Sequence, residues 1–232
     1  MERKLIYDQF LCGAICGTCN HGWMSQLDAQ FTQFLEVLSS PARPLSSLTD
    51  AQKSLAAHWA TKTAMVLSDT IQPAIAAIPG RHASHYFSTK EFPDSFIILA
   101  ARSDDTAAGF RFSFCPSWVV EADESSGDCP QIGYNGAYKV FMQLRDIMFL
   151  VCHYPVFHAK FLLAENSALV LASTPLHVSS APSLPDTLPG PFAFSMAVAV
   201  RLPALEKALN PPASSTCYCG SGETFGSCCR IT

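Results

Sequence analysis

The sequence predicts an α+β fold in which an N-terminal pair of helices packs on a mainly antiparallel sheet, followed by a small C-terminal metal module. Apolar residues recur at helical spacing up to about residue 73, whereas from residue 80 onward they form short runs of strand length. Helices followed by strands are typical of α+β folds. The third observation is the placement of ten cysteines, most of which lie near the two ends.

Composition limits the class of protein. Of 232 residues, 49% are hydrophobic and 15% are charged, which excludes a disordered chain. Acidic residues outnumber basic ones 19 to 15, so an extended basic surface for nucleic acid is disfavoured. No apolar run approaches the ~20 residues that a membrane span needs, and no signal-peptidase site follows the first residues. We therefore expect a cytoplasmic protein, where clustered cysteines more often bind metal than each other.

The first helix is predicted by five apolar residues at steps of three and four, which end near Ser39 and Ser40. These residues are Met24, Leu27, Phe31, Leu35 and Leu38. Thr49 and Gln52 then form a capping box that starts a second helix, which should run to about Pro73. Its buried stripe is expected to comprise Leu55, Trp59, Thr63, Val66 and Thr70. Lys62 falls opposite this stripe, where we expect a solvated side chain.

Four later segments are rich in β-branched and aromatic residues and should form strands: 96–102, 110–122, 138–144 and 147–154. Only Arg145 and Asp146 separate the last two, which predicts a tight hairpin. A strand-like run covers 192–200, and a short helix should precede Pro211. The expected organisation is a knuckle-like segment at 1–22, a helical hairpin at 23–78, an α+β body at 79–209, a linker at 210–216 and a metal module at 217–232.

The last segment carries four cysteines within 13 residues: Cys217, Cys219, Cys228 and Cys229. A Zn²⁺ ion takes four tetrahedral ligands at about 2.3 Å for sulfur, and a loop that folds back can bring four thiolates around one ion. Gly220 and Gly222 allow such a loop, and backbone N–H groups there can donate to the sulfurs. So short a tail cannot bury a core, so zinc binding would supply its folding energy. Two disulfides or free thiols are the alternatives, which the compartment and the spacing disfavour.

This pattern resembles the SEC-C motif found at the C-terminus of the SecA-type translocation ATPase and on many other bacterial proteins. The resemblance covers residues 217–229, with all four ligands, the turn 219–222 and the aromatic Phe225. It implies a bound zinc ion and contact with a protein partner such as a SecB-type chaperone, or with the ribosome. The motif's usual lysines are replaced here by Glu223, Thr224, Gly226 and Ser227. Attraction to an acidic chaperone or to rRNA is therefore not carried over.

Near the N-terminus, Cys16 and Cys19 form a CxxC pair directly before a predicted helix, and such a knuckle supplies two zinc ligands. The segments 16–28 and 55–66 resemble a family of bacterial HNH-endonuclease-like proteins. There an upstream CxxC completes the zinc site, and a histidine between the two knuckles is the general base of a ββα-metal fold. In this sequence no CxxC precedes Cys16 and no histidine precedes His21, so the catalytic histidine is not carried over.

Three interpretations of the CxxC pair remain: a partial or vestigial zinc knuckle, packed cysteines, or a nuclease whose start lies upstream. In the first, Cys12 and His21 would be improvised further ligands. The sequence thus favours a non-enzymatic zinc-binding cytoplasmic protein whose tail contacts a protein or the ribosome. The alternative is an HNH-like nuclease or its inactive truncated descendant, and no catalytic residue is assigned.

The remaining histidines and cysteines carry no predicted site. The pairs His82 with His85 and His153 with His158 lack a nearby partner cluster, so we expect structural or surface roles. Cys115, Cys129 and Cys152 flank strands and are expected to be small buried hydrophobic side chains.

Overall fold

The computed structural model describes residues 17–40, 42–71, 78–93, 95–103, 109–114, 119–122, 137–154, 160–163, 169–174, 178–179, 187–188, 194, 198–202, 213–214 and 223–228. The helical elements are α1 (Gly17–Cys19), the π-helical turn η2 (Asn20–Met24), α2 (Ser25–Leu38), the 3₁₀ turn η3 (Leu45–Ser47), α3 (Asp50–Ile71), α4 (Gly80–Thr89) and α7 (Phe225–Cys228). The strands are β1 (Phe96–Ser103), β2 (Phe110–Phe114), β3 (Val119–Ala122), β4 (Tyr138–Leu144), β5 (Ile147–His153), β6 (Lys160–Leu163), β7 (Leu169–Thr174), β8 (Val178–Ser179), β9 (Thr187–Leu188) and β10 (Val198–Leu202).

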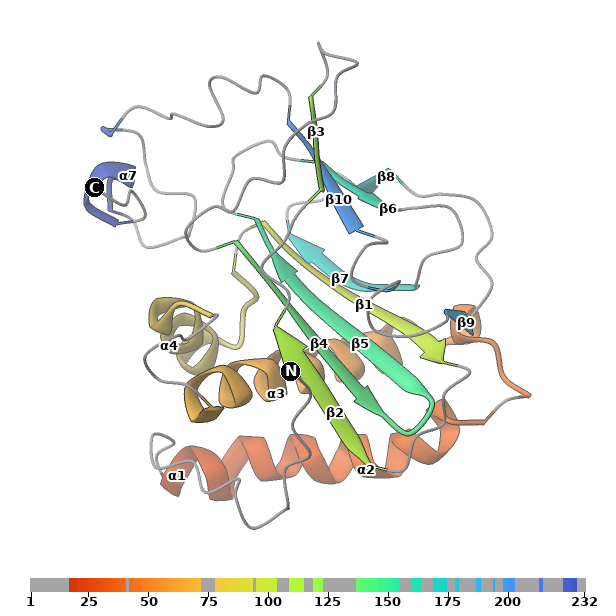
Figure 1. Ribbon diagram of the computed structural model, residues 1–232. Helices are drawn as coiled ribbons and strands as arrows, with labels where there is room; N and C mark the ends of the chain where they lie inside the picture. The colour runs from red at the N-terminus through yellow and green to blue at the C-terminus, as the bar shows by residue number, and fades with distance from the viewer. Residues whose placement is uncertain are drawn as a thin grey trace.

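The strands form two sheets (Figure 1). The larger has the order β2-β4-β5-β1-β7, with β9 also beside β1, and the smaller has the order β3-β10-β6-β8. Every pair along the path of the larger sheet is antiparallel, and only the short β9 runs parallel to β1. The protein is therefore α+β with a mainly antiparallel main sheet, as the sequence predicts.

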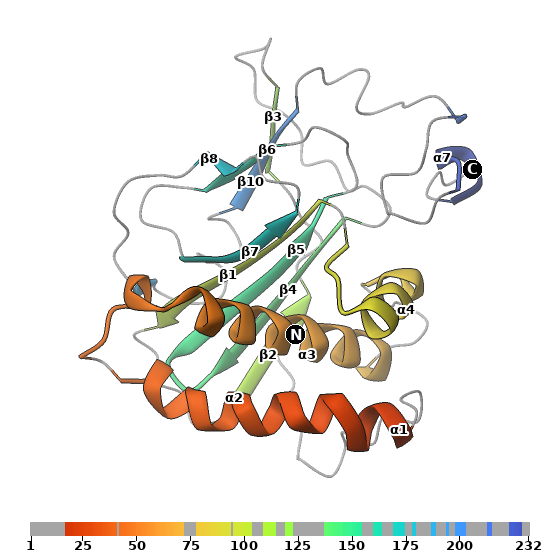
Figure 2. The same cartoon turned by 180° about the vertical axis from the view of Figure 1, so that it is seen from behind.

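Helices α2 and α3 cover one face of the main sheet, as seen from behind in Figure 2. The opposite face is also buried, and two of its side chains reach the smaller sheet and its neighbourhood. Lys139 Nζ donates to the carbonyl of Val198 in β10 at 2.9 Å, and Phe141 meets Phe194 edge-on at 6.4 Å between ring centroids. The main sheet is consequently a middle layer, which explains why β1, β4 and β5 are almost entirely buried.

The two predicted helices are confirmed close to their expected ends. Helix α2 ends at Leu38, and the capping box of α3 forms in both directions: Thr49 N–H donates to Gln52 Oε1 at 3.0 Å, and Gln52 N–H donates to Thr49 Oγ1 at 3.3 Å. The predicted hairpin is also confirmed, because Arg145 and Asp146 alone join β4 to β5 and Leu144 pairs with Ile147. Arg145 takes a positive φ of 57°, which the tight turn requires.

The prediction that one narrow stripe of α3 is buried is wrong, because the buried surface of this helix is wider. Leu55, Thr63 and Val66 are only half-buried, whereas the small residues of the helix are fully buried: Ala56, Ala57, Ala60 and Ala64. Because α3 contacts both α2 and strands β1, β4, β5 and β7, its buried arc extends beyond one stripe. The alanines let its backbone approach these neighbours closely.

Three aromatic side chains, one each from α2, α3 and the main sheet, meet at the centre of this core. Phe31 of α2 stacks on Trp59 of α3 with centroids 3.9 Å apart and planes within 8°. Phe149 of β5 packs against both rings, at 6.0 and 5.5 Å. Helix pair and sheet therefore share one hydrophobic core.

Helix α4 corrects the expectation that extended structure begins at residue 80. It runs from Gly80 to Thr89 and ends at Lys90, which has a left-handed φ of 65° and donates its N–H to the carbonyl of Tyr86. Its two fully buried side chains are His82 and Tyr86, one turn apart. Apolar periodicity does not detect a helix whose buried face is made of a histidine and a tyrosine.

Arg102 of β1 is a buried cation that holds the end of α2. Its Nη2 donates to the carbonyls of Leu38, Ser40 and Arg43 at 2.7, 2.8 and 3.1 Å, and its Nη1 pairs with Asp146 at 2.6 Å. The guanidinium thus joins the C-terminus of α2, the following loop and the β4–β5 turn. Its charge also complements the negative end of the helix.

No helix in the described part of the chain is both long and apolar enough to cross a membrane.

Replacing Arg102 by Met should lower the free energy of unfolding by about 3 kcal/mol, because three carbonyls and a partly buried carboxylate lose their donor. Urea unfolding followed by circular dichroism measures this change. Arg145→Met is the matched control: Arg145 pairs with Glu36 at 2.9 Å on the surface, and its loss should cost less than about 1 kcal/mol. Equal losses in the two variants would contradict the role assigned to Arg102.

Candidate functional site

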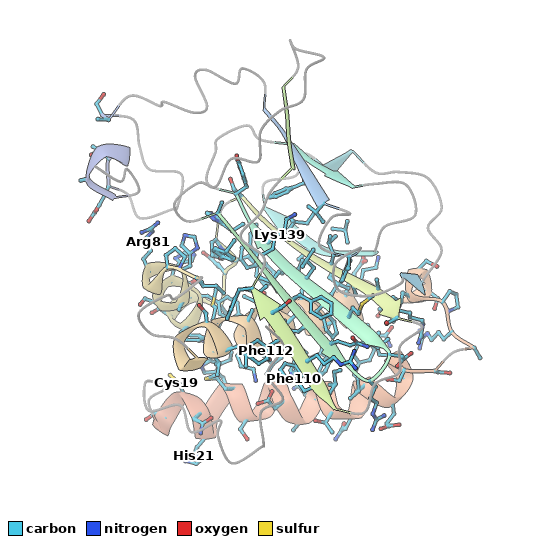
Figure 3. All side chains as sticks on the ribbon, in the orientation of Figure 1. Cys19, His21, Arg81, Phe110, Phe112 and Lys139 are labelled. Atoms are coloured by element: carbon cyan, nitrogen blue, oxygen red, sulfur yellow. The ribbon has the colours of Figure 1, made fainter. Side chains whose placement is uncertain are left out.

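The predicted metal ligands fall mostly outside the described residues. Cys217, Cys219 and Cys229 lie there, and so does Cys16, while Cys228 is described only as the last residue of α7. Cys19 is half-buried at the end of α1, and His21 is exposed in the next turn (Figure 3). Within the described residues, no three potential ligand side chains are close enough together to hold a metal ion.

Near the C-terminus, the described residues include a backbone contact between Ala213 and Gly226 that brings two separate parts of the chain together. Gly226 N–H donates to the carbonyl of Ala213 at 2.8 Å, and a Cβ on Gly226 would stand 2.8 Å from the Cβ of Ala213. Glycine is therefore required at this position. The short helix α7 is started by Thr224, whose carbonyl accepts the N–H of Ser227 at 3.1 Å and whose hydroxyl lies 2.8 Å from that of Ser227.

This contact lies within the cysteine-rich segment. The segment that holds Cys217 and Cys219 begins and ends at the contact between Ala213 and Gly226, and Cys228 follows two residues later. The contact thus joins the two ends of the segment that holds Cys217 and Cys219, next to Cys228 in the chain.

The two cysteine clusters lie in different places. Figures 1 and 2 both show α1 and α7 well apart, with α4 between them in height. Cys19 is thus on the helical side of the molecule, away from Cys228. This arrangement does not support a single site shared between the two ends of the chain.

The two segments that resemble HNH-like proteins meet at Asp28. Its Oδ1 accepts a hydrogen bond from Trp59 Nε1 at 3.1 Å and from Lys62 Nζ at 2.5 Å. The expectation that Lys62 is solvated is wrong: its side chain is 9% exposed, against 48% for Asp28. The wide buried arc of α3 encloses the lysine, and Asp28 on α2 supplies its counter-charge.

A second group of polar side chains, the imidazole cluster, comprises His82, Tyr138 and His153. His82 Nδ1 lies 3.1 Å from the hydroxyl of Tyr138, and the ring of His82 lies 4.4 Å from that of His153. All three side chains are buried, and they come from α4, β4 and β5. Burial, reinforced by His153, Arg81 and His85, lowers the pKa of His82 to about 2. Burial likewise raises the pKa of Tyr138.

A related contact joins α4 to α3. The hydroxyl of Tyr86 donates to the backbone carbonyl of His58 at 3.0 Å, so the Nδ1–H of His58 donates to that same hydroxyl, also at 3.0 Å. Burial lowers the pKa of His58 and raises that of Tyr86. Helix α4 is therefore held on both α3 and the sheet through histidine and tyrosine.

The sequence does not reveal this cluster, because its members are distant in the chain. Along the chain the nearest histidine to His82 is His85, which is exposed, and the nearest to His153 is His158, which lies outside the described residues. The usable indication was local: His82 and Tyr86 share a helical face, and His153 ends an apolar strand. Cys152 is buried as expected, whereas Cys115 and Cys129 lie outside the described residues.

Comparisons of this chain with models of protein families, with curated proteins and with solved structures find no match.

Asp28→Asn should lower the free energy of unfolding by about 2 kcal/mol, because a buried ammonium loses its charge partner while Trp59 still finds an amide oxygen. In the Asp28→Asn/Lys62→Met double variant part of this loss should be recovered, giving a coupling energy of about 1 kcal/mol or more in a double-mutant cycle.

Denaturant unfolding of the four proteins provides the cycle. Lys53→Met is its control, since Lys53 pairs with the fully exposed Asp50 and should change stability by less than about 0.5 kcal/mol. Strict additivity of the Asp28 and Lys62 effects would refute the proposed coupling.

Proposed function

We propose that this chain is a zinc-binding protein of a reducing cytoplasm whose C-terminal segment holds one Zn²⁺ through Cys217, Cys219, Cys228 and Cys229. The observation that carries the proposal is the closed base of this segment. The contact between Gly226 and Ala213 joins the two ends of the segment that holds Cys217 and Cys219, two residues before Cys228. The composition supports it as well, because paired cysteines in such a compartment more often bind metal.

Four protein ligands leave zinc no open position, so the site would be structural rather than catalytic. Zinc, when bound, would supply folding energy to a segment too short for a core. The protein's own residues would then present a fixed surface. Glu223, Thr224 and Ser227 are exposed on it.

This surface favours contact with a protein. None of its three described exposed residues is a cation, and the whole chain is net acidic at −4. Phosphate-rich partners are recognised mainly by clustered lysine and arginine. We therefore propose a protein partner, or a protein component of the ribosome, in preference to RNA.

An HNH-like nuclease, or its inactive descendant, is the second candidate. The meeting of its two characteristic segments at Asp28 supports it. However, that contact joins two helices, and both Trp59 and Lys62 are engaged and buried in it. The contact therefore has a structural role in joining the two helices and leaves neither side chain available for a reaction. A non-enzymatic role is the better-supported proposal.

The zinc site predicts one zinc ion per chain in protein purified under reducing conditions, and its loss in Cys228→Ala with the main fold intact. Metal analysis and circular dichroism measure the two quantities. Cys152→Ala is the matched control, because Cys152 is a buried cysteine of β5 outside both cysteine clusters and its replacement should leave the zinc in place.

Gly226→Val tests the contact between Gly226 and Ala213 without removing any of the four cysteines. Its side chain would collide with Ala213, so we expect weaker zinc binding with all four cysteines still present. Wild-type protein without zinc, or collapse of the whole fold in Cys228→Ala, would overturn the proposal.

A further inference from the structure

Helix α4 is attached to the rest of the protein largely through polar aromatic contacts. His82 contacts the imidazole cluster on the sheet, Tyr86 bonds to His58 of α3, and Trp23 packs against Tyr86 and Phe87 at 6.1 and 6.0 Å. The ammonium of Lys90, just beyond α4, lies 3.8 Å from the centre of the Trp23 ring. Neutral histidines are therefore part of how α4 is held.

His82 is poorly placed to carry a charge. It is fully buried, and its Nε2 has no hydrogen-bond partner within the described part of the chain. A protonated imidazole carries N–H groups on both nitrogens, and each needs an acceptor when buried. Protonation would therefore create an unpaired charged donor at the interface between α4 and the sheet.

The groups around His82 oppose its protonation as well. Its own helix contributes Arg81 and His85, β4 contributes Tyr138, and β5 contributes His153. None of these described neighbours is a carboxylate that could offset the charge. Arg81 lies at the start of α4 in Figure 3, one residue before His82.

The main core lacks this sensitivity. Phe31, Trp59 and Phe149 at its centre are not titratable, and the helices α2 and α3 meet the sheet through apolar side chains and through Arg102, which donates to backbone carbonyls at the end of α2. Acid should thus act on α4 before it acts on the core.

We propose that α4 is an acid-releasable element, which leaves the sheet when His82 is protonated while α2, α3 and the main sheet remain folded. Release would uncover aromatic side chains that α4 and its flanking residues now contact: Tyr138, which lies against His82, and Phe96, which lies against Phe92. The fold would then present a new apolar surface only at acidic pH. This inference is independent of the zinc proposal.

The sign and size of the effect follow from linkage. His82 has a pKa of about 2 when α4 is docked, and the usual value is 6.5. The released state therefore binds more protons below pH 6.5, and docking weakens as pH falls. Between these two pKa values, protonation of His82 alone should increase the ratio of released to docked molecules tenfold for each unit by which the pH falls.

Two tryptophans report the two events separately. Trp23 touches α4 and Lys90, whereas Trp59 lies in the main core. In the full chain labelled with 5-fluorotryptophan, ¹⁹F NMR should show the Trp23 resonance changing reversibly on acidification before that of Trp59. Trp23→Phe and Trp118→Phe variants assign the three signals.

His82→Phe is the decisive variant. It fills the site without a titratable group, and the negative slope of log(released/docked) against pH should become smaller in magnitude by one. A change in docking strength alone would shift the curve without altering its slope, so the slope separates titration from packing. His82→Gln provides the same test with a donor that can still reach Tyr138, should the Phe variant fail to fold.

His21→Gln, at an exposed histidine outside the imidazole cluster, should keep the wild-type slope. The titration is repeated in Cys228→Ala, which removes any contribution from acid release of zinc. Simultaneous change of the Trp23 and Trp59 signals, or an unchanged slope in both His82 variants, would overturn the proposal.

Discussion

The burial of α3 is the constraint on which the rest of the structure depends. This helix packs against both α2 and the main sheet, and its alanines allow an approach close enough to bury most of its circumference. Three of its polar groups are drawn into the interior by this packing, and each must then find a partner. Lys62 and the indole N–H of Trp59 find Asp28, and His58 finds Tyr86. The contact with Asp28 joins α3 to α2, and the contact with Tyr86 joins α3 to α4.

Much of the fold could be predicted because the relevant information is local. The capping box of Thr49 and Gln52, the apolar face of α2 and the β4–β5 hairpin each depend on residues a few positions apart. The features that could not be predicted depend on distant contacts. Lys62 is solvated or buried according to what covers α3, and α4 is a helix whose buried face is recognised only once Tyr138 and His153 lie beneath it.

The same distinction applies to the candidate sites. Four cysteines within one short segment carry their chemistry in their spacing, so the sequence was sufficient to propose zinc, and the closed loop at Gly226 adds a physical reason for glycine there. The imidazole cluster comes from three separate elements, and no spacing rule connects them. Its chemistry becomes apparent only from burial, since an exposed His82 would have an ordinary pKa and no consequence for docking.

These considerations divide the molecule into parts with different dependence on solution conditions. The core is held by apolar contacts and by Arg102, which donates to the backbone carbonyls at the end of α2 and pairs with Asp146. The proposed zinc segment needs deprotonated thiols, and the docking of α4 needs a neutral His82. Both peripheral elements are therefore stabilised in the same direction, by higher pH. Acidification would therefore loosen α4 and the C-terminal cysteine segment while the shared core persists. A single change of pH would thus alter the exposed surface of the protein without unfolding it.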